Sequence, residues 1–183
     1  MALPLPLILA GLGAAGLWLR SKRPANSALE DLPPSVYGQG VADDCAGLVG
    51  EAVGWPYWYG RGSPSTPWSQ GAQGVDCSGL VQMGLVRMGL LSPSSSDRGA
   101  TDLANASDPV PLGQQQPGDI AVYPGHVALV VGWPSDAEGW HSAVLSASGG
   151  TSSTKGDNPN ARVKVFDSGR YRSDFVTYAR LRK

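Results

Sequence analysis

The hydrophobic pattern of this chain changes its period part-way along, and that change limits the fold more than any other feature. Up to Gly89 the apolar residues recur at helical spacing, whereas from Asp119 onward they fall in short β-branched or alternating segments. Helices followed by strands are typical of the α+β class, in which the helices pack on an antiparallel sheet. We therefore predict an α+β fold.

Two amphipathic helices are expected before the strands. The apolar stripe of the first comprises Val41, Cys45, Leu48, Val49, Ala52 and Val53. This helix ends at Gly54, and Cys45 is expected to be a small buried apolar group on it. The second helix begins after Asp76, which is well placed as its N-cap, and ends near Gly89.

A sheet of about five antiparallel strands is predicted in the second half of the chain. The segments with strand character are residues 119–123, 126–131, 143–148, 161–166 and 175–181. An aromatic and glycine-rich segment, residues 55–62, lies between the two helices and is expected to form a loop.

The N-terminus carries a separate hydrophobic segment. Residues 3–19 are apolar or small, and as a helix they would reach roughly 25 Å, near the short end for a membrane span. Basic residues follow this segment instead of preceding it, which favours an uncleaved anchor over a cleaved signal. The alternative is a helix buried in the globular part.

These patterns divide the chain into three parts. Residues 1–20 form a hydrophobic membrane anchor or signal-like segment, residues 21–39 a proline-containing linker, and residues 40–183 the folded domain. The location expected from a single N-terminal anchor is either a bacterial cell membrane or the internal membrane of a virus particle.

Composition excludes several classes of partner and site. The chain has 183 residues and a formal net charge of −1, which disfavours binding to nucleic acid. Its two cysteines, Cys45 and Cys77, make no CxxC pair, so we predict no metal site, no cofactor and no disulfide scaffold. One bridge between the two remains formally open.

Cys77 stands at the expected start of the second helix. A free thiol is mostly protonated at neutral pH, and only the thiolate attacks. The partial positive charge of a helix N-terminus and a nearby imidazole both lower a thiol pKa. The backbone amides of Cys77 and Ser78 are also placed to stabilise an oxyanion. Cys77 is therefore the candidate nucleophile.

His126 is the candidate base. It follows Gly125 and opens the most apolar strand of the chain, so its ring would be held by a rigid element. A third group normally orients such a ring through its other nitrogen. Strand parity favours Ser146 as this third catalytic group, with His141, a backbone carbonyl or water as alternatives.

The motifs around these residues resemble those of the NlpC-type family of papain-like cell-wall peptidases. Asp-Cys-Ser-Gly-Leu-Val at residues 76–81 fits fully, and Pro-Gly-Asp-Ile at 117–120 and Gly-His-Val-Ala-Leu-Val at 125–130 fit well. Pro-Tyr-Trp-Tyr-Gly at 56–60 differs by one aromatic exchange. The resemblance implies a papain-like NlpC-type fold and an activity on the stem peptides of peptidoglycan.

The resemblance also assigns roles to individual residues. It makes Cys77 and His126 the catalytic pair, and it gives positions that contact the substrate or shape its site: Tyr57, Asp76, Ser78 and Arg98. Relatives usually carry a histidine at the third catalytic position, where this chain has Ser146.

Three hypotheses about function follow from the sequence. The first is a peptidoglycan-degrading cysteine peptidase or amidase, including a bacteriophage virion enzyme for host penetration or lysis. The second is a catalytically weak, membrane-anchored structural or peptidoglycan-binding module with the same fold. A lipid acyltransferase is disfavoured, because such enzymes commonly place His before Cys, whereas here Cys77 precedes His126.

Overall fold

A computed structural model of the protein describes the backbone of residues 39–182 and the side chains of these residues except positions 39, 40, 42 and 43. The expected N-terminal anchor and most of the expected linker lie outside the described residues. Within residues 39–182, no helix combines the length and the apolar character needed to span a bilayer.

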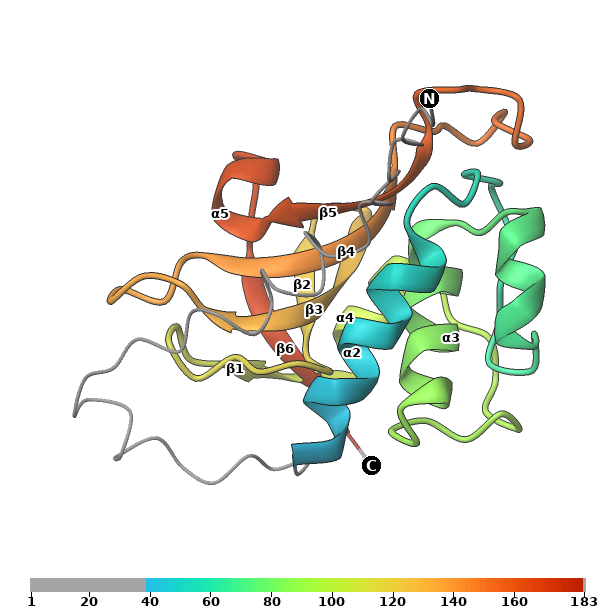
Figure 1. The fold of residues 1–183 in the computed structure, drawn as a ribbon. Helices are drawn as coiled ribbons and strands as arrows, with labels where there is room; N and C mark the ends of the chain where they lie inside the picture. Colours follow the sequence, from blue (N-terminus) through green and yellow to red (C-terminus); the bar gives the residue numbers. More distant parts are fainter. Residues whose placement is uncertain (1–38, 183) are drawn as a thin grey trace, which may run out of the picture.

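Helices precede the sheet, as predicted. The helical elements before the sheet are α2 (Gln39–Ala52), the 3₁₀ helix η2 (Trp68–Gln73), α3 (Cys77–Arg87) and α4 (Ala100–Asn105). Helices α2 and α3 lie on the same side of the sheet, as Figure 1 shows. The strands are β1 (Ser107–Val110), β2 (Ile120–Tyr123), β3 (His126–Pro134), β4 (Ser142–Ser148), β5 (Arg162–Asp167) and β6 (Thr177–Leu181), with a short helix α5 (Ser168–Tyr171) between the last two.

The strands form a single antiparallel sheet in the order β1-β6-β2-β3-β4-β5. All five predicted strands are present, but the described sheet has a sixth strand, β1, which the sequence analysis missed. Strand β1 contains Pro109, which weakens its strand signal. A proline is tolerated there because β1 is an edge strand that pairs only with β6.

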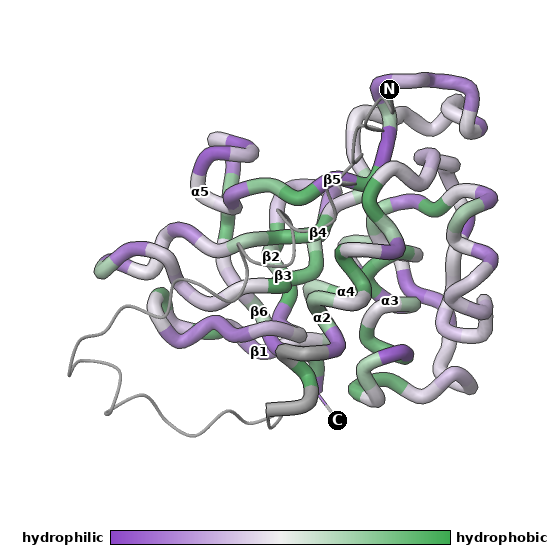
Figure 2. The backbone as a smooth tube through the Cα atoms, viewed as in Figure 1, coloured by the Kyte–Doolittle hydropathy of each residue, from purple (hydrophilic) through white to green (hydrophobic). Residues whose placement is uncertain are grey.

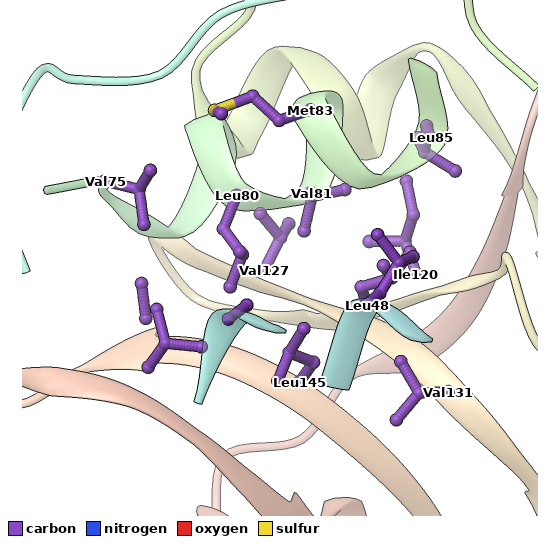
Figure 3. Packing of buried hydrophobic residues seen from close by; sticks show 14 of the residues in the cluster. Leu48, Val75, Leu80, Val81, Met83, Leu85, Ile120, Val127, Val131 and Leu145 are labelled. Carbon is purple, nitrogen blue, oxygen red and sulfur yellow. The ribbon is translucent and has the colours of Figure 1, made fainter. Parts of the chain in front are cut away.

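The main hydrophobic core lies between the helices and one face of the sheet. Leu48 of α2 and Leu80 of α3 are fully buried there, as are the paired residues Leu129 and Leu145 of β3 and β4. Figure 3 shows several of these side chains gathered below α3. Figure 2 shows how apolar residues concentrate along β3, β4 and α3.

A second apolar cluster covers the opposite face of the sheet. Val130 and Val144, which are paired across β3 and β4, belong to it, and Phe166, Tyr171 and Phe175 pack against it. Because both faces are covered, β3 reads as an uninterrupted apolar run. Tyr171 belongs to α5, so that helix lies close to this second face.

The first helix follows its predicted stripe, with one exception. Cys45 is only 1% exposed, its thiol contacts the Met88 sulfur at 3.4 Å, and burial raises its pKa to about 12, as expected of an inert core residue. Val53 was wrongly placed on the buried stripe. It is 51% exposed because α2 ends one residue earlier, at Ala52. Cys45 and Cys77 are both free thiols.

A buried ion pair joins the start of β2 to β6. The Asp119 side chain is fully buried and accepts hydrogen bonds at 2.8 Å from Nε and Nη2 of Arg180. The backbone amide of Gln116 also donates to Asp119, at 2.9 Å. The carboxylate therefore fixes the turn before β2, the strand that pairs with β3 beside the site.

Candidate active site

Asp76 organises the first turn of α3. Its side chain accepts hydrogen bonds from the backbone amide of Gly79 at 2.8 Å and from the Ser78 hydroxyl at 3.0 Å. The predicted N-cap is therefore confirmed. Its second carboxylate oxygen accepts the backbone amide of Gly60 at 2.8 Å, so one side chain links the aromatic loop to the helix start.

The aromatic loop lies directly against α3. A Cβ atom added to Gly79 would lie 2.2 Å from the carbonyl oxygen of Arg61 and 2.8 Å from Cα of Gly62. The same Arg61 carbonyl accepts the backbone amide of Asp76 at 2.9 Å. Only glycine at position 79 permits this close approach, so the glycine two residues after Cys77 has a packing reason.

Cys77 lies at the N-terminus of α3 and is partly buried. Burial raises the pKa of its thiol, while hydrogen bonds from the backbone amides of Val127, Ser78 and Cys77 itself act in the opposite direction. The expectation of a lowered thiol pKa is therefore wrong for the resting protein, because burial and the negative charge of Asp76 outweigh the amides. The Val127 amide that contacts the sulfur follows His126 by one residue in β3. Cys77 therefore lies at the start of that strand.

The ring of His126 is held through one nitrogen. Its Nε2 atom lies 2.9 Å from the hydroxyl of Ser146 and 3.2 Å from the hydroxyl of Tyr171. Ser146 is fully buried on β4, at the strand parity predicted for it. Burial lowers the pKa of His126 to about 4, and the positive charge of Arg172 acts in the same direction.

The alternative third group, His141, has a different partner. Its Nδ1 atom lies 2.5 Å from a carboxylate oxygen of Asp167, the N-cap residue of α5. Asp167 also accepts the backbone amide of Gly169 in that helix. His141 therefore secures α5 at the end of β5 and is not the group that contacts His126.

Tyr171 is a site residue that the sequence analysis missed. It follows a turn-like segment and lies 45 residues from His126 along the chain, so no local spacing indicates their contact. Gln82 was also missed. This fully buried residue of α3 accepts the Arg98 amide at 2.9 Å and donates to the Arg98 carbonyl, which fixes that segment on the wall of the site.

A cleft of about 450 Å³ opens over Cys77 and His126. All four predicted substrate-contacting residues line it: Tyr57, Asp76, Ser78 and Arg98. Tyr171 and Arg172 complete the wall on the α5 side. Ser146 is absent from the lining because it is fully buried. Tyr57 is 7% exposed, and burial and the nearby Cys77 both raise its pKa.

The profile of the NlpC/P60 family matches residues 54–157, more than half of the chain. The chain belongs to the NlpC/P60 family. The matched range contains Cys77, His126 and Ser146, whereas Tyr171 lies beyond its end.

Individual relatives agree with this family assignment. Peptidoglycan endopeptidase RipB of Mycobacterium tuberculosis (strain ATCC 25618 / H37Rv) is 39% identical over 93 residues, which cover 46% of this chain and 37% of RipB. This chain therefore spans little more than a third of that curated relative.

Two solved structures show the shared NlpC/P60 fold. The P60 domain of the Mycobacterium avium subspecies paratuberculosis antigen MAP1204 has a TM-score of 0.54 at 26% identity, covering 80% of this chain and 97% of that domain. The second is RipD from Mycobacterium tuberculosis, a non-catalytic NlpC/p60 domain protein adapted to peptidoglycan binding. It has a TM-score of 0.51 at 20% identity, and the match covers 78% of this chain and 96% of the RipD chain. The papain-like NlpC-type fold predicted from the sequence agrees with both.

Proposed function

We propose that this chain is a cysteine peptidase that hydrolyses the stem peptides of peptidoglycan, with Cys77 as nucleophile and His126 as base. The observation that carries the proposal is the placement of the cysteine and the histidine in one cleft. A cysteine at a helix N-terminus opens into the same cleft as a histidine whose Nε2 is already held by Ser146 and Tyr171. Membership of a family that includes a peptidoglycan endopeptidase supports the substrate class.

The charge state of the resting pair suggests the order of proton transfers. Burial raises the pKa of Cys77 and lowers that of His126 to about 4, so a neutral thiol faces a neutral imidazole at pH 7. With Nε2 engaged, Nδ1 is the nitrogen left to accept the thiol proton as the sulfur attacks the scissile carbonyl. The new C–S bond leaves a negative charge on the carbonyl oxygen.

The first turn of α3 supplies donors for that oxyanion. The amides of Cys77 and Ser78 precede the first intrahelical hydrogen bond, which runs from the Leu80 amide to the Asp76 carbonyl. The imidazolium then protonates the leaving amine, and a thioester remains on Cys77. Water, deprotonated by His126, hydrolyses this thioester and restores the thiol.

Charged groups on the cleft wall suggest how the substrate is oriented. Asp76 gives the Tyr57 side of the cleft a fixed negative charge suited to the free amine of a stem peptide. Arg98 contributes a positive charge to the lining and suits a carboxylate of the substrate. Arg98→Gln should therefore raise KM for stem peptides more than it lowers kcat.

The N-terminal segment supplies the proposed means of delivery. Residues 3–19 would hold the enzyme at a bacterial membrane or at the internal membrane of a bacteriophage particle, where it would serve host penetration or lysis. Expression of the full chain and of a variant lacking residues 1–20, followed by membrane fractionation, tests this. Equal recovery of both in the soluble fraction would remove the anchor from the proposal.

The activity is tested by digesting purified muropeptides with the full chain and identifying the products by mass spectrometry. Cys77→Ala and His126→Ala should each abolish fragment release. Cys45→Ala is the matched control, because it removes the other thiol from the core without touching the cleft, and it should retain activity. Unchanged release by Cys77→Ala would exclude the proposed nucleophile.

A peptidoglycan-binding module without turnover is the second candidate. It is favoured by the neutral resting pair and by Ser146, a neutral and short group, at the third position. On this alternative, muropeptides bind to the wild type without being cut. The Cys77 thiol also stays unreactive toward iodoacetamide between pH 5 and 9. Fragment release that depends on Cys77 decides against it.

A further inference from the structure

The hydroxyl groups of Ser146 and Tyr171 meet at one atom of His126. Each lies within hydrogen-bond distance of Nε2, at 2.9 and 3.2 Å, and the Ser146 hydroxyl donates to that of Tyr171 at 3.4 Å. The three polar atoms therefore contact one another pairwise. A single serine holds an imidazole by one neutral hydrogen bond, which is a weak constraint on a ring that must keep one orientation.

We propose that Tyr171 is a positioning residue, and that Ser146 and Tyr171 together form a two-residue orienting group for His126. This inference rests on the proposed function. With a proton on Nε2, the ring donates to Ser146, and Ser146 in turn donates to Tyr171. In that arrangement Nδ1 is left free to accept the Cys77 proton. The same hydrogen bonds strengthen when the ring becomes charged, so nothing reorients during proton transfer.

The packing of Tyr171 supports this role. Its ring stacks on Phe166 with centroids 4.1 Å apart and meets the ring of Tyr123 edge-on at 5.6 Å. Aromatic contacts on two sides leave the phenol little freedom. Its hydroxyl is therefore presented to His126 by a fixed ring, which a serine side chain on its own cannot provide.

The start of α5 is fixed as well. Asp167 caps this helix by accepting the Gly169 amide, and it also contacts His141. Three residues of the helix follow the cap before Tyr171 ends it. The His141 contact, which plays no direct part at His126, thus anchors the element that carries the second orienting hydroxyl.

The test compares Tyr171→Phe with Tyr123→Phe in the full chain. Both changes remove one hydroxyl and keep an aromatic ring in the same cluster. The Tyr123 hydroxyl, however, donates to the Ser168 carbonyl and not to His126. The rate of Cys77 alkylation by iodoacetamide between pH 5 and 9 is the first readout, because this small reagent needs none of the substrate contacts along the cleft.

We expect Tyr171→Phe to lower the alkylation rate about three- to ten-fold at pH 7, the range for loss of one neutral hydrogen bond. Tyr123→Phe leaves both hydroxyls at Nε2 in place and should lower the rate less than Tyr171→Phe does, although it removes a hydrogen bond to Ser168 of α5. The double variant Ser146→Ala/Tyr171→Phe should lose at least the product of the two single effects, because neither hydroxyl then remains to hold Nε2.

The second readout is the tautomer of His126, followed by ¹⁵N NMR of the imidazole. The wild type should carry its proton on Nε2, and the double variant should show a mixture of tautomers. A Tyr171→Phe protein that matches Tyr123→Phe in alkylation would overturn the proposal. So would a double variant no slower than Ser146→Ala alone.

Both readouts are independent of turnover. If the wild type cuts no muropeptide, the proposed function fails, while the NMR spectra still decide whether Tyr171 orients His126, even in a protein whose Cys77 does not react with iodoacetamide. If the wild type is active, Tyr171→Phe should lower kcat with little change in KM. A change in KM alone would instead mark Tyr171 as a substrate contact and overturn the positioning role.

Discussion

Replacing Gly79 with alanine tests whether the aromatic loop is locked against α3. The added methyl group would lie 2.2 Å from the Arg61 carbonyl oxygen and 2.9 Å from that of Gly62, and both are backbone atoms that move only with the loop. Overpacking of this kind costs about 1–3 kcal/mol. Displacement of the loop also strains the hydrogen bond from the Gly60 amide to Asp76, worth about 1 kcal/mol. The gain in helix propensity offsets about 1 kcal/mol.

The net expectation is a protein about 1–3 kcal/mol less stable to urea unfolding, with a lower rate of Cys77 alkylation. Gly47→Ala is the matched control, because Gly47 lies exposed in α2 and its added Cβ would meet nothing within 4 Å. That variant should gain up to about 1 kcal/mol. Equal stability of Gly79→Ala and Gly47→Ala would refute the reasoning about the loop.

Three further predictions concern the thiols, the histidine and the buried ion pair. Native protein should take up one iodoacetamide, at Cys77, while Cys45 stays unlabelled because it is 1% exposed and its pKa is about 12; peptide mapping checks this. The folded-state pKa of His126, about 4, lies below its ordinary 6.5, so the unfolded chain binds an extra proton between these values and the free energy of unfolding decreases as the pH is lowered from 6.5 to 4. Urea titrations should show roughly 2–3 kcal/mol more loss from pH 7 to 4 in the wild type than in His126→Gln. Arg180→Met leaves the Asp119 carboxylate buried beside an uncharged side chain and should cost about 3–5 kcal/mol at pH 7; a loss below 1 kcal/mol would contradict that.

Local patterns in the sequence were sufficient for much of the site. Asp76 lies one residue before the helix that it caps, and His126 opens the strand that its neighbours define. The contact of Ser146 with His126 follows from strand parity once β3 and β4 are paired. These predictions depend on spacing of two to four residues or on one strand pairing, and both are visible in the chain.

The features that were missed depend on distant contacts. Tyr171 meets His126 only because α5 folds back over the second apolar face, and Gln82 of α3 contacts Arg98, which lies 16 residues further along the chain. The raised thiol pKa of Cys77 was missed for the same reason. The helix N-terminus is readable from the sequence, whereas the burial that outweighs it is a property of the assembled core.

The remaining errors in the fold concern an edge strand of the sheet and the end of a helix. Strand β1 was missed because Pro109 and the polar residues before it suppress the strand signal, and an edge position tolerates them. Val53 was placed on the buried stripe because the helical period was continued one residue past the end of α2.

The central claim is that Cys77 forms a covalent intermediate with the stem peptide. It is tested most directly by mixing the full chain with muropeptide, quenching in acid within milliseconds to seconds, and measuring the mass of the intact protein. The proposed mechanism predicts an acyl adduct on Cys77 in the wild type, located by peptide mapping and absent from Cys77→Ala. Fragment release without any adduct on Cys77, or equal release by Cys77→Ala, would contradict it.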